Sequence, residues 1–239
     1  MAIYLKKEPL FLCHYDRSAI DNHFAYGIPI PSIQIGNDTS KSKFGDASLK
    51  LNPVISTDPN YNIKVTLNDK FDFTSDFTIS FYKYVNAMVS NINGNGNSST
   101  FWFSYATLFI DSGGSYSFEL TKGNPNPSRW IDTRNLYSAN TDVGKWVHIE
   151  FSYNAASKTV RVFRNGTAVL TRVLDSDLDY YSPMPMTLII QDDANISEIL
   201  ITKDCLHTAN FEPPTEPYSW YNIKDAYRDI PTNKLHGYK

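Results

Sequence analysis

The sequence predicts an all-β protein, built as an antiparallel sandwich of two sheets, and three observations support that prediction. Apolar and polar residues alternate in many short segments, which is the pattern of strands that bury one face. Turn-forming clusters separate about a dozen such segments at near-regular spacing, and no stretch shows a convincing helical period. The chain has 239 residues. As one unit of that size it can bury roughly 70–75% of its unfolded surface, so it needs no disulfide to fold.

The clearest of these segments is the region 146–170, WVHIEFSYNAASKTVRVFRNGTAVL. Its first strand alternates, so that Val147, Ile149 and Phe151 share one face. Asn165 and Gly166 separate two later runs and predict a type I′ hairpin turn, because both residues tolerate positive φ. The region is therefore predicted as an antiparallel meander with one apolar face, which a second sheet must cover.

The N-terminal part of the chain predicts further strands of the same kind. Residues 76–85, DFTISFYKYV, show the cleanest alternation in the sequence. Residues 16–38 are polar and contain two prolines, so they indicate a long loop with a short extended piece near its end. Shorter alternating runs predict strands over 9–15, 47–51 and 61–67.

The middle and the C-terminal part complete the set. Residues 91–100, NINGNGNSST, predict a flexible tip because Gly and Asn favour turns and offer little to bury. Alternating runs predict strands at 101–109, 115–120, 129–133, 186–191 and 196–204. The core pattern is continuous from the first strand to the last, which indicates one domain, 1–211, followed by a tail.

That tail, residues 212–239, contains four prolines and five large aromatic residues but no alternating run. One interpretation is a disordered terminus. The other is an arm that docks on a neighbouring subunit, and the sequence favours it because exposed aromatic side chains are costly. The predicted docking residues are Tyr218, Trp220, Tyr221 and Tyr227.

Composition and charge exclude several classes of protein. The net charge is −3, and Lys and Arg are scattered singly, so nucleic acid is not an expected partner. No apolar run approaches the ~20 residues of a membrane span. Charged residues stand where a signal peptide would have its apolar core, so we expect synthesis in the cytoplasm without secretion. Cys13 and Cys205 have no metal-type spacing and are predicted as buried reduced thiols rather than a disulfide.

Five segments of the chain, in order, resemble laminin-G-like (concanavalin A-like) jelly-roll domains. They read LFLCHYD, SKFGDASLKL, DFTISFYKYV, GKWVHIEFSYNAASKTVRVFRNGTAV and ISEILITKDCLHTANFEPPTEPY, and together they span residues 9–218. The closing block ANFEPPTEPY most resembles the version found in bacteriophage tail, fibre and capsid-associated proteins. Two departures stand out: Ser197-Glu198 replaces a common Asp-Glu, and residues 101–140 match only loosely.

The resemblance implies a jelly-roll sandwich whose first and last strands pair, which would bring Cys13 and Cys205 into one neighbourhood. A disulfide becomes possible if their Cβ atoms come within about 4.5 Å of each other. It also implies a virion structural protein, made in the host cytoplasm, that displays a lectin-like module to host-surface polysaccharide. Other virion proteins and further copies of the chain are then the expected partners. The alternative is a stand-alone carbohydrate-binding or adhesion module without a virion role.

Enzymatic hydrolysis is not expected. Retaining glycosidases need two carboxyl groups roughly 5–5.5 Å apart. On a strand, that spacing requires two carboxylates two or four residues apart on one face, and no such pair of the six glutamates lies on a predicted strand. Glu212 and Glu216 are four residues apart but flank prolines in the tail. His148 lies on a predicted strand without a second histidine at ligand spacing, so it is interpreted as a packing residue rather than a metal ligand.

Calcium is a candidate ligand, because laminin-G-like folds often bind it at a rim loop through oxygen atoms. The candidate ligands are Asp192, Asp193 and Asn195, before the last predicted strand, with the aspartates of 175–179 as a second group. Aspartates in turns also cap backbone amides, which is the competing interpretation.

Carbohydrate is the other candidate ligand, because sugar sites combine a flat aromatic face with a few convergent polar groups. Such residues gather in the variable middle of the chain: Trp102, Tyr105, Trp130, Asp132, Arg134 and Tyr137. The competing interpretation places both tryptophans in the core. Trp130 is predicted to be the more exposed of the two.

Overall fold

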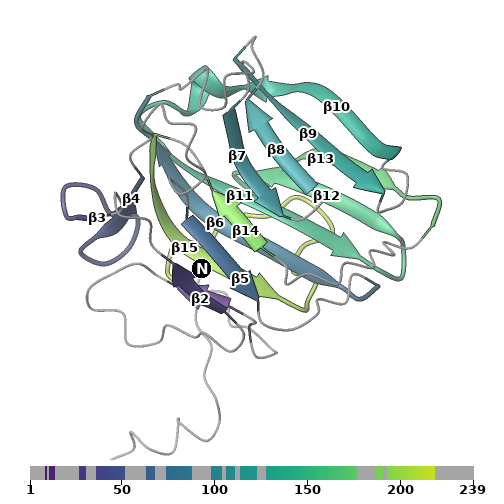
Figure 1. Ribbon diagram of the computed structural model, residues 1–239, viewed down its shortest axis with the longest axis horizontal. Coiled ribbons are helices and arrows are strands. Elements are labelled where there is room, and N and C mark those ends of the chain that lie inside the picture. Colours follow the sequence, from purple (N-terminus) through teal and green to yellow (C-terminus); the bar gives the residue numbers. More distant parts are fainter. Residues whose placement is uncertain are drawn as a thin grey trace, which may run out of the picture.

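The computed structural model is an all-β sandwich of two antiparallel sheets, as the alternation predicts (Figure 1). The structure describes residues 9, 11–13, 27–30, 36–51, 63–67, 74–87, 98–103, 106–110, 114–122, 128–176, 187–190 and 193–218. Within these ranges the only helical element is a single 3-10 turn, η1 (Ala139–Asp142). No helix among the described residues is long and apolar enough to cross a membrane.

The first sheet contains the predicted meander at one edge, in the order β13-β12-β11-β6-β15-β4-β3, with β1 also paired to β15. In this sheet β1 and β15, the first and last of the described strands, pair antiparallel. Phe11 is paired with Ile201 and Cys13 with Ile199. This pairing confirms what the resemblance implies. Its strands are β1 (Phe11–Cys13), β3 (Gly36–Asp38), β4 (Ser48–Lys50), β6 (Phe77–Val85), β11 (Trp146–Asn154), β12 (Thr159–Arg164), β13 (Thr167–Val173) and β15 (Ala194–Thr202).

The second sheet has the order β10-β9-β8-β7-β14-β5-β2, and Figure 1 shows β7 to β10 side by side. Two predictions need correction here. Residues 101–109 form parts of two strands, β7 and β8, instead of one. The predicted loop 16–38 contains two short strands, β2 and β3. A proline is tolerated in β2 because β2 lies at the edge of the sheet. The strands are β2 (Gly27–Ile30), β5 (Ile63–Leu67), β7 (Ser98–Phe103), β8 (Ala106–Ile110), β9 (Ser115–Lys122), β10 (Ser128–Ser138) and β14 (Thr187–Ile190).

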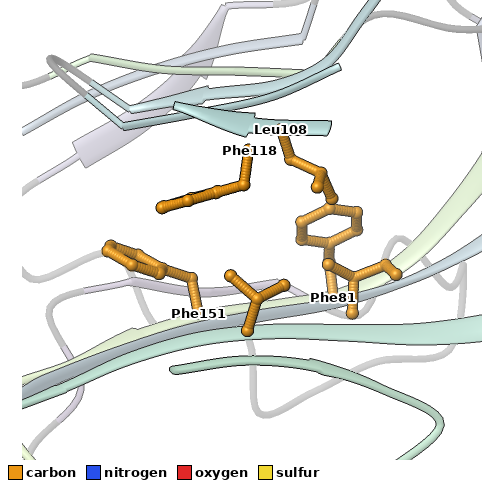
Figure 2. Close-up of a pocket in the computed structure, with 6 residues that line it drawn as sticks. Phe81, Leu108, Phe118 and Phe151 are labelled. Carbon is orange, nitrogen blue, oxygen red and sulfur yellow. The ribbon is translucent and has the colours of Figure 1, made fainter. Parts of the chain in front are cut away.

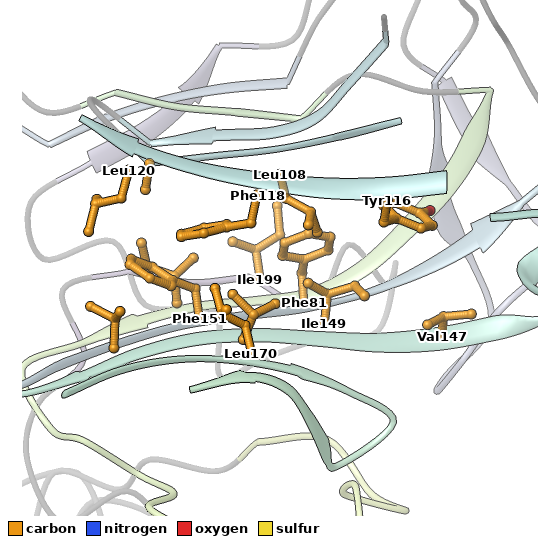
Figure 3. Close-up of a cluster of buried hydrophobic side chains, with 14 of the residues drawn as sticks. Phe81, Leu108, Tyr116, Phe118, Leu120, Val147, Ile149, Phe151, Leu170 and Ile199 are labelled. Carbon is orange, nitrogen blue, oxygen red and sulfur yellow. The ribbon is translucent and has the colours of Figure 1, made fainter. Parts of the chain in front are cut away.

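The core lies between the two sheets and is built from their inward-facing alternate residues. In Figure 3, Leu108 and Phe118 of the second sheet point toward Phe151 and Ile149 of the first. These side chains, together with Phe81 and Val162, enclose a narrow gap that has no room for a water molecule (Figure 2). The gap is wholly apolar, so this region is packed core and not a ligand pocket.

The predicted hairpin turn is present between β12 and β13. Asn165 has φ of 48° and Gly166 has φ of 74°, which is the positive-φ pair that a type I′ turn requires. The Asn165 side chain also has a structural role, because its Oδ1 accepts a hydrogen bond from the backbone N of His148 at 2.9 Å. The turn is thereby fixed against β11.

Residues 203–218, which we call the C-terminal strap, cross the outer face of the first sheet after β15. Thr78 of β6 holds the start of the strap, since its Oγ1 donates to the carbonyl of Asp204 at 2.7 Å and accepts from the N of Leu206 at 3.0 Å. Further along, the hydroxyl of Tyr82 donates to the carbonyl of Pro214 at 2.6 Å. The strap therefore covers sheet positions that alternation alone would assign to solvent.

Cys205 lies in this strap as a half-buried free thiol. Burial raises its pKa above the ordinary value, so the thiol stays protonated at neutral pH. The side chain of Cys13 lies outside the described part of the chain.

Candidate functional site

Five of the six predicted sugar-contact residues lie on strands of the second sheet, and its register brings two of them into one row. Asp132 of β10 is paired with Glu119 of β9, and Glu119 with Thr107 of β8. Thr107 is in turn paired with Trp102 of β7. Directly paired residues occupy the same face of a sheet, so the positions of Trp102, Thr107, Glu119 and Asp132 form a row across four strands.

That row belongs to the outer face of the sandwich. Phe118 and Leu120, on either side of Glu119, are buried in the core at 0% and 1% exposure, so alternation puts Glu119 on the opposite face. Arg134 confirms the direction, because its Nη2 lies 2.5 Å from Glu119 Oε1 and its side chain is 41% exposed. A charged pair thus lies at the solvent surface beside the row, which we call the β10 face (Trp102, Thr107, Glu119, Asp132 and Arg134).

Trp130 and Tyr105 are not part of this row. Trp130 occupies a register shift between Arg129 and Ile131, where it has no partner on β9, and such bulges often redirect a side chain. The side chains of Trp102, Trp130 and Asp132 are not among those described, and Tyr105 lies outside the described residues altogether.

Tyr137 does not lie on the β10 face, contrary to the prediction. It is paired with the fully buried Tyr116, and the two rings stack with their centroids 4.4 Å apart. The physical reason is strand alternation, since Tyr137 has the same parity as the buried Ile131, whereas Arg134 has the opposite one. The hydroxyl of Tyr137 is buried, and burial raises its pKa well above the ordinary value.

Tyr137 instead belongs to a buried ladder of rings and charges that the sequence analysis did not find. Lys83, on the inward face of β6, donates to the hydroxyl of Tyr116. On the other side the guanidinium carbon of Arg164 lies 4.8 Å from the centre of the Tyr137 ring, and Arg164 pairs with the buried Asp142. The available signal was a lysine on the apolar face of β6, where a charge requires a partner.

Asn195, a predicted calcium ligand, has a structural role instead. Its amide is fully buried, and Nδ2 donates to Asp38 Oδ2 at 2.9 Å and to Ser48 Oγ at 3.0 Å. Its Oδ1 accepts from Asn86 Nδ2 at 3.0 Å. Hydrogen bonds from Ser40 and Asn195 lower the pKa of Asp38 to about 2.

The other predicted ligands are Asp193 and Asp192. Asp193 supplies its backbone oxygen to the N of Asn86 at 2.8 Å, and Asp192 lies outside the described residues. The cation beside this network is Lys41, whose Nζ lies 2.5 Å from Asn86 Oδ1. No cluster of three or more His, Cys, Asp or Glu side chains suited to a metal ion occurs in the described ranges.

Tyr218, predicted to dock on a neighbouring subunit, is docked on its own sheet. It is fully buried, and its hydroxyl lies 2.7 Å from Ser80 Oγ and 3.0 Å from His148 Nε2. Its backbone N donates to Glu198 Oε2 at 3.2 Å. The packed body therefore extends at least to residue 218, beyond the predicted boundary at 211; Trp220, Tyr221 and Tyr227 lie outside the described residues.

The strap also engages the carboxylate of Glu150 on β11. His207 places its Nδ1 2.9 Å from Glu150 Oε2 and stacks on Phe211 with ring centres 3.5 Å apart. Burial raises the pKa of Glu150, and the hydrogen bond from His207 opposes that effect. His148 is buried beside them, as its interpretation as a packing residue requires, and burial lowers its pKa to about 3.

Replacing Tyr218 with phenylalanine should lower the free energy of unfolding by about 1–2 kcal/mol, because the buried hydroxyl has two partners. The Ser80–His148 contact at 2.8 Å remains and limits the loss. Urea denaturation at neutral pH measures the effect. An unchanged midpoint would contradict the docking of Tyr218 in this structure.

The family model described as the concanavalin A-like lectin/glucanases superfamily matches residues 59–197, which is more than half of the chain. The chain belongs to this concanavalin A-like superfamily. The fold and the laminin-G-like resemblance predicted from the sequence are thereby confirmed. A comparison with curated proteins found no match.

Solved structures with the same fold include binding domains of bacterial toxins. The botulinum neurotoxin serotype D binding domain is 16% identical with a TM-score of 0.57, and the match covers 83% of this chain and 49% of that one. The binding domain of botulinum neurotoxin DC in complex with rat synaptotagmin II is also 16% identical, with a TM-score of 0.58 and the same coverage. The concanavalin A-like chain spans about half the length of these proteins, and at such identity the likeness concerns the fold alone.

Proposed function

We propose that this concanavalin A-like protein is a non-enzymatic structural component of a bacteriophage particle and displays a lectin-like module to host-surface glycans. The β10 face is the observation that carries the binding role. Its register unites Trp102, Glu119 and Asp132 in one row, and Arg134 lies beside them at the solvent surface. An aromatic position flanked by charged hydrogen-bonding groups is the combination that sugar sites use.

The state of the carboxylates supports a role without catalysis. Glu150 is held by His207, and Glu198 accepts from the backbone of Tyr218, so both are buried under the strap. Glu119 is paired with Arg134. A glycosidase needs two carboxyl groups that face one sugar, and of these three only Glu119 lies on the β10 face.

Two further observations support this proposal, one for the particle and one for recognition. The closing block ANFEPPTEPY, whose resemblance is to bacteriophage tail, fibre and capsid-associated proteins, forms most of the strap and is built into the sandwich. The similar solved structures are described as binding domains, which agrees with a recognition role at the level of the fold. Host-cytoplasmic synthesis, a virion location, other virion proteins and further copies of the chain as partners all belong to this proposal.

Mass spectrometry of purified particles, followed by localisation in the particle density, tests the virion role. The protein is expected at a stoichiometry that matches a symmetric site on the particle. Its absence from particles, together with glycan binding by the isolated protein, would instead favour the stand-alone carbohydrate-binding module.

A glycan array tests the β10 face with matched variants. Arg134→Ala should weaken binding of the recognised glycan by roughly tenfold or more, which corresponds to about 1.4 kcal/mol. Stability should change by no more than about 1 kcal/mol, because the pair with Glu119 is partly exposed. Arg172→Ala, an exposed arginine on β13 of the other sheet, is the control and should leave binding unchanged. Equal effects of the two variants would exclude the β10 face.

A further inference from the structure

The outer face of the first sheet carries a pair of aromatic rings just beyond the strap. Trp146 of β11 is paired with Tyr84 of β6, and the rings meet edge to face with centroids 5.7 Å apart. Both residues are half-buried, so each keeps part of its surface in solvent. The next row of the same face, Tyr82 and His148, is already covered by the strap.

A glycine lies next to Tyr84, in the turn before β11. Gly144, in the turn before β11, lies beside the Tyr84 hydroxyl, and even an added Cβ would remain 3.9 Å from that oxygen. Its φ of 75° favours glycine at this position, so the turn keeps a residue without a side chain there. The turn therefore adds no side chain beside the Tyr84 hydroxyl.

Three lysines lie close to the aromatic residues of this face, either over a ring or next to one in the sequence. Lys41 Nζ lies 4.8 Å from the centre of the Tyr84 ring, and Lys43 Nζ lies 4.8 Å from that of Tyr82. Lys145, next to Trp146, is exposed and donates to the backbone carbonyl of Thr141 at 3.1 Å. Within the described part of the chain, none of the three forms an ion pair with a carboxylate.

Acidic residues of the same region are engaged elsewhere. Asp38 accepts hydrogen bonds from Ser40 and Asn195, and Asp142 pairs with Arg164 in the buried ladder of rings and charges. Lys41 is held by the neutral amide of Asn86, so its charge is not neutralised by that contact. This part of the outer face therefore combines flat apolar rings with ammonium groups whose charge is available to an external anion.

We propose that Tyr84, Trp146, Lys41 and Lys145 form a second binding site, and that it takes an acidic oligosaccharide such as a polyuronate. The apolar face of a pyranose ring would pack on Trp146, because indole rings offer a large flat surface. The sugar carboxylates would be bound by the ammonium groups of Lys41 and Lys145. This site lies on the other sheet from the β10 face and is independent of the glycan proposed there.

Binding of hexagalacturonate, measured by calorimetry on the full chain, tests the proposal. Wild-type protein should bind it, and affinity should fall between about 50 and about 200 mM salt because charge pairs at a surface are screened. A neutral galactose oligomer of the same length should bind roughly tenfold more weakly or worse. Undetectable binding of hexagalacturonate at low salt would overturn the proposal.

Variants locate the site and separate it from the alternatives. Trp146→Ala and the double variant Lys41→Gln, Lys145→Gln should each reduce affinity by roughly tenfold or more. Trp146→Phe keeps an aromatic ring and should retain most of the affinity, which guards against loss through misfolding. Arg172→Gln changes the same charge on a distant strand and should have no effect. Equal losses for Arg172→Gln and the lysine variant would show that net charge alone attracts the polyanion and would overturn the site.

Two further measurements separate this site from the β10 face and from a membrane-binding surface. Arg134→Ala should leave hexagalacturonate binding unchanged, so failure of the β10 face and failure of this site give different results. Vesicles of phosphatidylglycerol test whether the same lysines and rings recognise an anionic membrane. Vesicle binding that is lost in Trp146→Ala while hexagalacturonate binding is absent would replace the sugar with a lipid surface.

Discussion

Replacing Gly166 with alanine should destabilise the protein by about 3 kcal/mol or more. Gly166 has φ of 74°, which strains any residue with a side chain. The added Cβ would also overlap the carbonyl oxygen of Phe211 and lie 2.9 Å from its carbonyl carbon. The backbone of the strap lies directly on the turn, since the N of Phe211 donates to the carbonyl of Gly166 at 2.9 Å. The strap must therefore move away from the turn, and urea denaturation at neutral pH measures the cost.

Gly114→Ala is the matched control. Gly114 has nearly the same φ, 75°, but the nearest atom to an added Cβ is Asn140 Nδ2 at 4.0 Å. This variant isolates the conformational cost of positive φ, which is about 1 kcal/mol. If Gly166→Ala is no more destabilising than Gly114→Ala, the strap does not lie against the hairpin turn as the structure has it.

The position of the strap also explains which parts of the fold local patterns could predict. The hairpin at Asn165-Gly166 was predictable, because turn chemistry and alternation act between residues that are close in sequence. Ser80, His148 and Glu150 alternate with core residues and therefore have the pattern of a solvent face. They are fully buried because a segment more than fifty residues further along the chain covers them. No periodicity in either segment encodes that contact.

The candidate site was predictable to a similar degree. Residue types indicated the β10 strand, and alternation along that strand already separates Arg134 from Tyr137. The row that joins Trp102 to Asp132 depends on the register of four strands, which the sequence does not specify before the strands are paired. Lys83 was missed for a different reason: its partner, Tyr116, comes from the facing sheet.

Acidification should destabilise the folded protein through His148. Burial lowers the pKa of His148 from 6.5 to about 3, so the unfolded chain takes up this proton first as the pH falls. The stability that depends on neutral His148 is complete above pH 6.5 and declines as the pH falls toward 3. Over that whole range the loss is at most about 5 kcal/mol. Urea denaturation at a series of pH values from neutral to about 4.5 should show the decline.

The groups that face His148 determine how the result is assigned. Ser80 Oγ and the hydroxyl of Tyr218 contact Nε2, and the charges that add to the effect of burial are His207 and Lys43. Glu150 acts in the opposite direction, because its raised pKa makes the folded state bind its proton more readily as the pH falls.

The contribution of His148 is therefore the difference in slope between wild type and His148→Gln, which cannot titrate. The variant should start less stable at neutral pH, since two buried hydroxyls lose a partner, and should lose less stability on acidification. If the free energy of unfolding falls in parallel for the two proteins as the pH is lowered, His148 is not the group responsible for the loss of stability.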